Sequence, residues 1–502
     1  MAQKKKQESN QNKKDFRTYQ FHISKGDALF EYCDTMCFNS KNLYNVTNFY
    51  IRQIMTGVKK DKSLQSENEK EVFRIIEKTL PLMNQVKEET HEKELLKYED
   101  KCKKETGNKK LKAPKLKLFQ LPTATEWMVS RDFLDGVFKF SNHPDYRALP
   151  AQSSQYIMKQ CLQDWSSYIE LVKLYRNDPK SLTGNPNIPR YAKKDGRKIA
   201  LITNQDAVIY PKKDQDGWEL KLPKIDIRYN LGQFQMDGKL KEVRIVPKGT
   251  GYTLELVHEV PKIPIKTTKE IAQRIAAIDL GVSNFVTMTN NIGERPIIIK
   301  GGKLKSKNQW YNKQRAHYYG ILRQGKSPKE GLFHSKRLTR LDEKRHRFIK
   351  DFFHKASKQI VSYCVEYQID TLVIGKNKGW KTDIQLAKKD KQSFTHIPFN
   401  LFISTLTYKL EAQGILVLVS EESYTSKASF LDRDDIPTYG EEIGTPKFSG
   451  YRKTRGMYQS YKHGLLNADV NGSANILRKV FPNAFTDRDS GVLKAPKSLL
   501  VA

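Results

Sequence analysis

The feature that most constrains this sequence is a change of hydrophobic pattern near Pro264. Beyond it, short apolar runs alternate with long amphipathic segments. The runs Ile275–Ile278, Thr371–Ile374 and Ile415–Val419 predict buried strands, and Arg345–Tyr367 predicts a long amphipathic helix. Strands that alternate with helices predict an α/β domain, in which a crossover helix joins parallel neighbours.

The N-terminal half predicts a different architecture. Arg17–Ile23 alternates like a strand, and Ala28–Tyr175 has helical spacing, except for the Lys-rich segment Lys97–Lys117, which we interpret as a solvated loop. A mainly β module follows, with expected strands at Ile199–Thr203, Trp218–Leu222, Lys241–Pro247 and Tyr252–His258. With 502 residues in all, the chain is predicted to be a multidomain α+β protein.

The charge of the chain restricts its partners. Lys and Arg total 89 against 56 acidic residues, a formal charge of +33. Such an excess favours nucleic acid as the partner, because phosphate contacts release counterions. No apolar stretch approaches the ~20 residues that a membrane span needs, and the Met1–Lys14 segment has no apolar centre. We therefore expect a soluble intracellular protein with no membrane partner.

The five cysteines are too sparse for a disulfide framework. Cys33 and Cys37 are four residues apart in an expected helix, which would also suit a metal pair. Because there is no second pair, two buried thiols are the favoured interpretation.

Acidic residues follow the predicted strands of the C-terminal half. The run Ile275–Ile278 ends in Asp279 just before a glycine, and Ile415–Val419 leads into Glu421 and Glu422. Asp469 lies near the start of the expected helix Ser473–Leu477. Each acid alone also fits a turn, a solvated strand end or a helix N-cap. The ordered set instead predicts a site for two Mg²⁺ ions, with Mn²⁺ as an alternative, since such ions need oxygen ligands from several elements.

At this point the sequence resembles the TnpB family, the transposon-encoded nucleases related to type V CRISPR effectors. The blocks that carry the resemblance are Ala277–Asn284, Ser306–Lys313, Arg345–His354, Ile374–Lys381, Glu422–Lys427 and Asn467–Ile476, with weaker likeness at Lys41–Tyr50 and Arg197–Gln205. The resemblance implies a RuvC-like nuclease of the RNase H fold, a helical recognition lobe and a β-barrel-like wedge domain. The implied boundaries are 1–24 and 181–265 for the wedge, 25–180 for the recognition domain, 266–423 and 467–502 for the nuclease, and 424–466 for a nucleic-acid-binding insert.

The chain departs from the family at the second acid. The family usually has a glutamate at the end of the strand Thr371–Ile374, where this sequence has Gly375. A subset of the family, and the Fanzor relatives, resemble this pattern and use a glutamate on the following strand. Because side chains alternate along a strand, only one of Glu421 and Glu422 should face inward. We favour Glu422 for its spacing from Tyr424, so that Asp279, Glu422 and Asp469 are the expected catalytic metal ligands and Glu421 is the alternative.

A second departure concerns zinc. Many relatives have paired CxxC motifs in the insert, but residues 424–466 contain no cysteine, so no zinc is expected. We interpret Asp432, Asp434 and Asp435 as solvated loop acids.

Basic residues mixed with aromatic ones predict helices that line a nucleic-acid channel, although helix-face tyrosines are more often packing residues. The candidate nucleic-acid-binding residues are Tyr50, Arg52, Gln53, Lys303, Lys305, Lys307, Trp310, Tyr311, Lys313, Arg315, Lys336, Arg337, Arg340, Lys344, Arg345, Arg347, Lys376, Lys378, Lys381, Lys427, Arg452 and Arg455.

The sequence thus indicates an RNA-guided DNA endonuclease that acts beside a short flanking motif. The implied partners are a guide RNA encoded near its own gene and double-stranded DNA, with a monomer favoured and a bacterial cytoplasmic location associated with the nucleoid. The alternatives are a non-cutting guided repressor, a CRISPR-associated effector, an unguided nuclease or transposase, and an RNA-binding scaffold.

Overall fold

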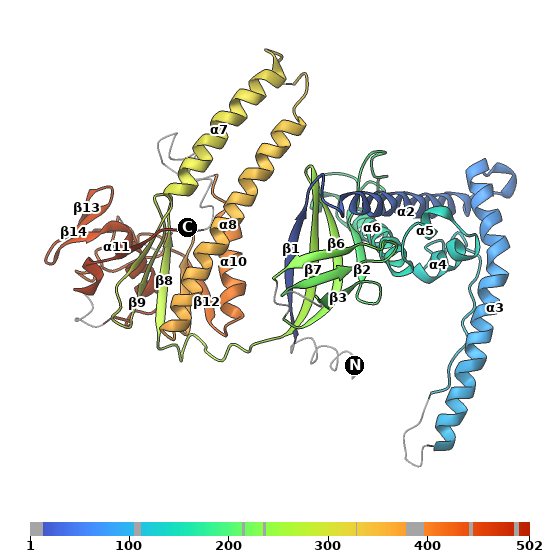
Figure 1. The fold of residues 1–502 in the computed structure, drawn as a ribbon, viewed down its shortest axis with the longest axis horizontal. Coiled ribbons are helices and arrows are strands. Elements are labelled where there is room, and N and C mark those ends of the chain that lie inside the picture. Colours follow the sequence, from blue (N-terminus) through green and yellow to red (C-terminus); the bar gives the residue numbers. More distant parts are fainter. Residues whose placement is uncertain are drawn as a thin grey trace. The chain divides into compact units, whose positions relative to one another are not determined.

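The chain forms two compact units, Met1–Pro261 and Lys262–Ala502, each described here by itself (Figure 1). The computed structural model describes residues 14–104, 112–212, 216–233, 237–327, 329–377, 396–440, 445–485 and 491–501. The prediction of a multidomain α+β protein is confirmed, since both units combine helices with sheets. The finer domain boundaries stay predictions.

The first unit contains two antiparallel sheets. The larger has the order β1-β7-β6-β2 and comprises β1 (Lys14–Ile23), β2 (Ala200–Thr203), β6 (Lys239–Lys248) and β7 (Gly251–Pro261). The smaller comprises β3 (Val208–Pro211), β4 (Trp218–Lys221) and β5 (Arg228–Gly232). One four-stranded and one three-stranded sheet thus occupy the region where the wedge was expected, and its barrel-like form stays a prediction.

Helices α2 (Phe30–Gly57), α3 (Glu67–Lys104), α4 (Arg131–Phe140), α5 (Pro144–Arg147) and α6 (Ala151–Asn177) share one hydrophobic core with the larger sheet. Cys33 and Cys37 are buried free thiols in α2, as expected. The loop expected at Lys97–Lys117 is wrong over its first residues, because α3 continues to Lys104. Glu and Lys are good helix formers, so a polar segment can continue a helix without an apolar stripe. No helix in the described ranges is both long and apolar enough to span a bilayer.

The second unit is built on a six-stranded sheet with the order β12-β11-β8-β9-β10-β16. Its strands are β8 (Ile275–Leu280), β9 (Asn284–Asn290), β10 (Ile297–Lys300), β11 (Thr371–Gly375), β12 (Leu416–Ser420) and β16 (Lys497–Leu499). Strands β8, β11 and β12 are parallel, as the crossover argument predicts, and β8, β9 and β10 form antiparallel pairs. Parallel strands place their carboxyl ends at one edge, so residues that follow β11 and β12 lie near the end of β8.

The helices of this unit cover the sheet. Helices α8 (Lys336–Glu366) and α10 (Phe399–Glu411) pack on it through a cluster that includes Phe285, Phe353 and Phe402. Helix α11 (Ala468–Val480) packs against β8, β9 and β11. Helix α7 (Gly302–Arg323) pairs with the first half of α8 to form a hairpin that extends beyond the sheet (Figure 1).

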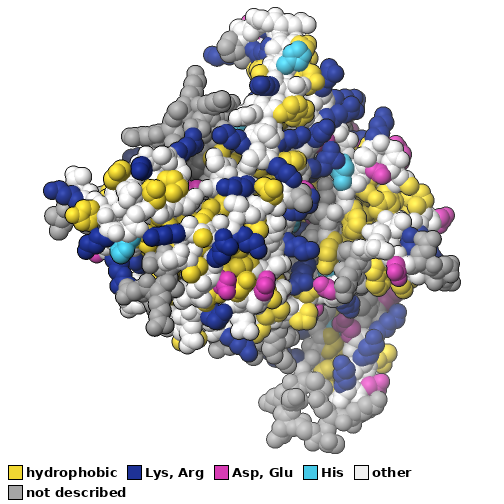
Figure 2. All heavy atoms as spheres, turned by 60° about the vertical axis from the view of Figure 1, so that its left-hand side comes forward, with side chains coloured by type: hydrophobic (Ala, Val, Ile, Leu, Met, Phe, Trp, Pro, Cys, Tyr) yellow, Lys and Arg dark blue, Asp and Glu magenta, His cyan; other side chains and the backbone are white. Residues whose placement is uncertain are grey.

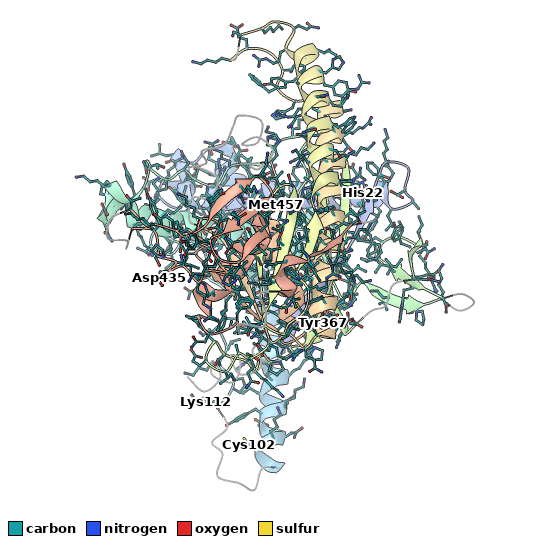
Figure 3. The ribbon with its side chains drawn as sticks, turned by 90° about the vertical axis from the view of Figure 1, so that its left-hand side faces the viewer. His22, Cys102, Lys112, Tyr367, Asp435 and Met457 are labelled. Carbon is teal, nitrogen blue, oxygen red and sulfur yellow. The ribbon has the colours of Figure 1, made fainter. Side chains whose placement is uncertain are left out.

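Helix α8 begins nine residues earlier than the sequence predicted. Ser335 caps it, because its hydroxyl accepts a hydrogen bond from the backbone N–H of Leu338 at 3.2 Å. The insert between β12 and α11 contains a small antiparallel sheet of β13 (Tyr451–Thr454), β14 (Met457–Ser460) and β15 (Gly464–Asn467). Figure 3 labels Met457 on β14, and Tyr367 directly after the C-terminal end of α8.

Candidate active site

The first predicted acid is placed by a buried strand. Asp279 is the penultimate residue of β8, flanked by the buried Ile278 and Leu280. Helix α11 crosses close to it at Gly472, where a Cβ atom would lie 2.9 Å from Asp279 Oδ2. Glycine at 472 therefore allows the helix backbone to approach the carboxylate.

Asp469 reaches the same place from the first turn of α11. Asn467 caps the helix, since its side chain accepts hydrogen bonds from the backbone N–H groups of Asp469 and Val470. Asn284 Nδ2 donates to Asp469 Oδ2 at 2.7 Å, and Lys300 Nζ donates to Asn284 Oδ1 at 3.0 Å. The cap and the amide together orient the Asp469 carboxylate.

Glu422 occupies the space that Gly375 leaves free. Gly375, the last residue of β11, pairs with Ser420 of β12, and the Glu422 N–H donates to Asn377 Oδ1 at 3.0 Å. A Cβ atom on residue 375 would overlap Glu422 Oε2. The Glu422 carboxylate thus lies where a side chain at the end of β11 would begin. It reaches this place from the loop that directly follows β12, and its catalytic role stays a prediction.

Glu421 points to a different environment. Its Oε2 pairs with Lys479 Nζ, and its Oε1 accepts from the Ser423 N–H at 2.6 Å. Lys479 is largely buried and also donates to the backbone carbonyls of Ser423 and Pro437, each at 3.1 Å. Its partners satisfy Glu421, so the structure brings Glu422 and not Glu421 beside Asp279.

The electrostatics of the site favour a bound cation. Burial, with the adjacent charge of Asp469, raises the pKa of Asp279 to about 7. Burial, followed by the charges of Asp279 and Glu421, raises the pKa of Glu422 to about 8. Both shifts arise because ionised carboxylates repel one another in a poorly hydrated site. A divalent cation would reverse both of these effects.

The residues fit a hard cation such as Mg²⁺. Glu422 Oε2 is buried and has no hydrogen-bond partner, which is costly unless another ligand is present. All donors at the site are carboxylate or amide oxygens, which suits Mg²⁺ or Mn²⁺. Within the described ranges, however, no group of three or more His, Cys, Asp or Glu side chains is already arranged to hold an ion. The metal role of Asp279, Glu422 and Asp469 therefore stays a prediction.

The insert contributes a cation to this site. Arg452 on β13 lies with its guanidinium 3.5 Å from Asp469 Oδ1, and its side chain is 45% exposed. Its positive charge lowers the pKa of Asp279, against the larger effect of burial. Arg452 was predicted to bind nucleic acid, and its exposed position beside the carboxylates is compatible with a phosphate contact.

The predicted nucleic-acid residues fall mainly on the α7–α8 hairpin, over which Figure 2 shows many Lys and Arg side chains. Lys307 Nζ lies 4.3 Å from the centroid of the exposed Trp310 ring, and Arg337 stacks on Tyr318 at 4.6 Å. The exposed members of the set are Lys303, Trp310, Lys313, Arg315, Lys336, Arg337, Arg340, Lys344, Arg347, Lys427, Arg452 and Arg455, and the partly exposed ones include Gln53, Lys305, Lys307 and Lys376. Lys378 and Lys381 lie outside the described residues.

Other members of the predicted set have packing roles. Tyr50 is buried against Phe138 in the first unit, so its ring offers no surface to a nucleic acid. The guanidinium of Arg52 donates to the carbonyl of Pro189 and stacks on Tyr191. In the second unit, the largely buried Tyr311 donates to Asp342 Oδ1 at 2.6 Å.

Two more basic residues of the set are also engaged. Arg345 donates to Asn308 Oδ1 at 2.8 Å and to the His396 carbonyl at 2.6 Å. Lys303 Nζ donates to the Val501 carbonyl at 2.7 Å. These bonds join α8 and α7 to distant parts of the unit, which is a structural role.

The interpretation of Asp432 and Asp434 as solvated acids is wrong. Asp432 accepts from the hydroxyls of Ser429 and Ser460 and from two backbone N–H groups, at 2.6 to 3.0 Å. Asp434 accepts from the Ser429 N–H at 2.7 Å and from Ser449. These bonds tie the insert together, whereas Asp435 is exposed, as expected (Figure 3).

The sequence did not single out Asn284, Gly472 or Lys479 as individual contributors to the site. Asn284 and Gly472 stood inside the blocks that carry the family resemblance, which was the available signal. Nothing in the sequence marked Lys479 as part of the site, because lysines are common in the last turn of a helix, where they interact favourably with the helix dipole.

Comparison with known families supports the resemblance. Residues 255–381 match the family model OrfB_IS605, described as a probable transposase. The predicted resemblance to the TnpB family is confirmed. The match spans the TnpB-like segment from β7 past Gly375, including Asp279.

Solved structures give only distant matches. The chain is similar to a Cas12f1–sgRNA–target DNA complex with 16% identity, over 82% of this chain and 95% of that chain, at a TM-score of 0.29. A CRISPR-Cas12f ternary complex matches with 13% identity, over 92% of this chain and 98% of that chain, at a TM-score of 0.28. The C2c1 protein of Alicyclobacillus acidoterrestris in complex with single-guide RNA matches with 8% identity, over 81% and 70%, at 0.35. Scores this low support no argument about this chain, and no curated protein matches it.

Proposed function

We propose that this chain is an RNA-guided DNA endonuclease that cleaves its target by metal-assisted phosphodiester hydrolysis in a RuvC-like site, next to a short flanking motif. The observation that carries the proposal is the position of Glu422, whose carboxylate fills the space above Gly375 beside Asp279. Three acids from β8, from the end of β12 and from α11 are the set that hydrolysis of a phosphodiester with two metal ions requires.

Each residue has a role that follows from its contacts. Asp279, Glu422 and Asp469 would hold Mg²⁺ or Mn²⁺, which supplies water activation and stabilisation of the leaving oxygen when bound. Asn284 orients Asp469. Lys479 neutralises Glu421 and so keeps a fourth negative charge from the site. Arg452 offers a positive charge to a phosphate near Asp469.

The guided character rests on the family match and the charge. A net charge of +33 and the exposed basic hairpin α7–α8 suit a long polyanion better than a small substrate. Base pairing by a guide RNA would then supply the sequence specificity, while the protein contacts backbone phosphates.

The test begins with the protein co-expressed with the DNA that flanks its gene, followed by sequencing of any RNA that remains bound. The ribonucleoprotein is then incubated with Mg²⁺ and a plasmid library with randomised flanks around the target. We expect a discrete RNA and cleavage beside one flanking motif, with Asp279→Ala and Glu422→Ala at least 100-fold slower and Glu421→Gln within a few fold of wild type. Cleavage that needs no RNA would refute the guided activity.

A guided repressor that binds without cutting is the second candidate. It is favoured by Gly375, which stands where the resembled family usually has its second acid. It predicts target binding that Mg²⁺ and the Glu422→Ala change leave unaltered, with no cleaved product.

A further inference from the structure

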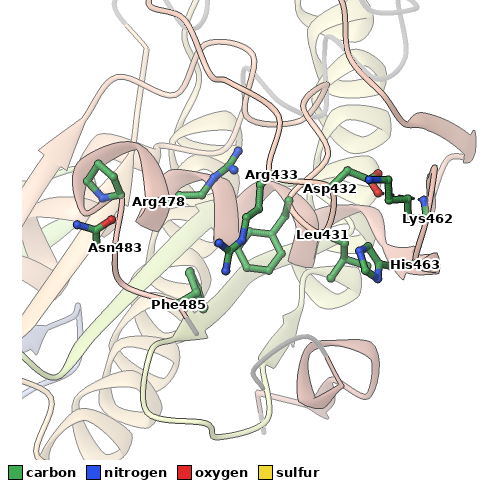
Figure 4. A pocket seen from close by; sticks show the side chains of 10 residues that line it. Leu431, Asp432, Arg433, Lys462, His463, Arg478, Asn483 and Phe485 are labelled. Atoms are coloured by element: carbon green, nitrogen blue, oxygen red, sulfur yellow. Dashed lines mark hydrogen bonds between the residues drawn. The ribbon is translucent and has the colours of Figure 1, made fainter. Parts of the chain in front are cut away.

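A cavity in the second unit lies apart from the candidate active site. It has a volume of about 530 Å³, within the range of small-ligand pockets. It is lined by Phe430, Leu431, Asp432, Arg433, Lys462, His463, Arg478, Pro482, Asn483 and Phe485 (Figure 4). The lining therefore comes from the insert and from the last turn of α11 with the residues that follow it.

The position of Arg478 separates this cavity from the carboxylates. Arg478 follows Asp469 by nine residues on α11. Nine residues correspond to about 13 Å along the helix axis and to about two and a half turns. The two side chains consequently project from opposite faces of the helix, and a ligand in the cavity does not lie at the proposed cleavage site.

The cavity is electropositive. Arg433, Lys462 and Arg478 contribute three cationic side chains against one acid, Asp432. The Asp432 carboxylate is already saturated by serine hydroxyls and backbone N–H groups. It is therefore poorly placed to neutralise a further cation, which leaves an excess of positive charge for an anion.

Arg478 has an unused donor. One of its terminal nitrogens donates to the Asp434 carbonyl, but its Nε is buried without a hydrogen-bond partner. Burial lowers the pKa of Arg478, while the nearby charges of Asp434 and Asp435 oppose this effect and that of Arg433 adds to it. A buried guanidinium with a free N–H is costly by itself and becomes favourable when an anion binds.

Arg433 reaches the cavity from an unusual backbone conformation. Its φ angle is +57°, in the left-handed region that residues other than Gly, Asn and Asp rarely adopt. The conformation is held by backbone hydrogen bonds from Arg433 to Phe430 and from Asp434 to Ser429. Such an outlier at a cavity lining directs attention to ligand binding.

Apolar and aromatic side chains complete the lining. Phe430 and Phe485 form an edge-to-face pair with ring centroids 4.7 Å apart, and Leu431 and Pro482 extend the apolar surface. A cluster of cations beside aromatic faces is the combination that binds a nucleotide, the phosphate at the cations and the base or sugar against the rings.

We propose that this cavity is a nucleotide-binding pocket, in which Arg433, Lys462 and Arg478 bind a phosphate group and the partly exposed Phe485 ring, supported by the buried Phe430, contacts the base or sugar. The phosphate comes either from a single nucleic-acid strand or from a free nucleotide. Because the pocket is separated from Asp279 by α11, its occupancy does not depend on the nuclease activity proposed above.

Two substitutions test the pocket with little risk to folding. Arg433→Gly removes a cation at a position where glycine relieves the positive φ, and Lys462→Glu reverses an exposed charge. Lys497→Glu is the matched control, since it makes the same charge change at an exposed residue of β16 outside the lining. All variants are made in the full chain, in both the wild-type and the Asp279→Ala background.

Binding is measured by calorimetry with uridine monophosphate, uridine, inorganic phosphate and a five-nucleotide uridine strand. We expect uridine monophosphate to bind more tightly than uridine or phosphate alone, and each pocket variant to weaken it roughly tenfold. Lys497→Glu and Asp279→Ala should bind as wild type does. A strand that binds much more tightly than the mononucleotide, with the same sensitivity to both variants, identifies a strand as the source. Equal affinity identifies a free nucleotide.

The proposal is overturned if uridine monophosphate does not bind, or if its affinity is the same in wild type, Arg433→Gly and Lys462→Glu. Loss of cleavage in Asp279→Ala with unchanged nucleotide binding would separate the two activities. Failure of the nuclease proposal would therefore leave this result intact.

Discussion

The missing side chain at residue 375 makes a strong prediction about cleavage. In Gly375→Ala the new Cβ would lie 2.5 Å from Ile476 Cδ1 and 3.1 Å from Ile476 Cγ1, and it would overlap Glu422 Oε2. Carbon atoms prefer separations of about 3.5 to 4.0 Å. Both neighbours must therefore move by roughly 1 Å.

The two displacements have different consequences. Ile476 is buried on α11, so its displacement overpacks the core and costs about 1 to 3 kcal/mol. In a unit of this size, that lowers the melting temperature by about 2 to 12 °C. The Glu422 carboxylate is the end of a flexible side chain, so it moves at little cost in stability. A misplacement of about 1 Å at a catalytic group nevertheless reduces the rate on the order of 100-fold.

The double variant Gly375→Ala/Ile476→Val separates these effects. Valine lacks the Cδ1 atom, so we expect much of the thermal stability to return while cleavage stays low. The assays are differential scanning fluorimetry and single-turnover cleavage with the guide-loaded protein, and Ile476→Val alone is the control. If Gly375→Ala cuts at the wild-type rate, or if Ile476→Val restores cleavage together with stability, the placement of Glu422 is not the cause.

Three further predictions concern the same carboxylates. Gly375→Glu/Glu422→Gly returns the acid to the end of β11 and should regain at least tenfold in cleavage rate over Glu422→Gly alone, whereas no gain would argue against a shared position. The raised pKa values of Asp279 and Glu422 stabilise the protein below pH ~4, and this contribution is lost as the pH rises through about 7 to 8. Without Mg²⁺ the melting temperature should thus fall as the pH rises from 5 to 8.5, and it should fall less steeply in Glu422→Gln. Mg²⁺ should raise the melting temperature more at pH 8 than at pH 5.5. A melting temperature that does not change with pH would contradict the raised pKa values. Lys479→Met leaves the negative charge of Glu421 without its partner and should slow cleavage about tenfold. Adding Glu421→Gln to the same chain should restore the rate. If it does not, Lys479 has a packing role only.

Part of the fold follows from local patterns. The runs that became β8, β11 and β12 are mainly apolar, and the amphipathic spacing of α8 is regular, so periodicity was sufficient to locate them. The expectation that Ile415–Val419 is buried is wrong, because β12 is an edge strand that is partly exposed, with Val419 54% exposed. The pairing of β16 with β10 joins residues 200 positions apart through three residues, too little sequence to carry a pattern. The last turns of α3 were misassigned because a solvated helix has no apolar stripe.

The site was predictable only in part for a related reason. A carboxylate at or after an apolar run is visible in the sequence, which is why Asp279 and Glu422 could be proposed. The hydrogen bonds that hold Asp432 and Asp434 involve hydroxyl and backbone groups up to 30 residues away, and no spacing rule connects them. Burial of an acid depends on such partners, so the sequence alone favoured a solvated interpretation.

The relation between Gly375 and Glu422 shows what a motif search misses. A search for a glutamate at the end of β11 would classify this chain as inactive, because Gly375 stands at that position. The structure instead preserves the location of the carboxylate, since Glu422 Oε2 overlaps the place where a side chain at 375 would start. Residue 375 must then be a glycine, because any side chain there would overlap the Glu422 carboxylate. Glycines at 375 and 472 both lie close to carboxylate oxygens of the proposed site, where a Cβ atom would crowd Glu422 and Asp279.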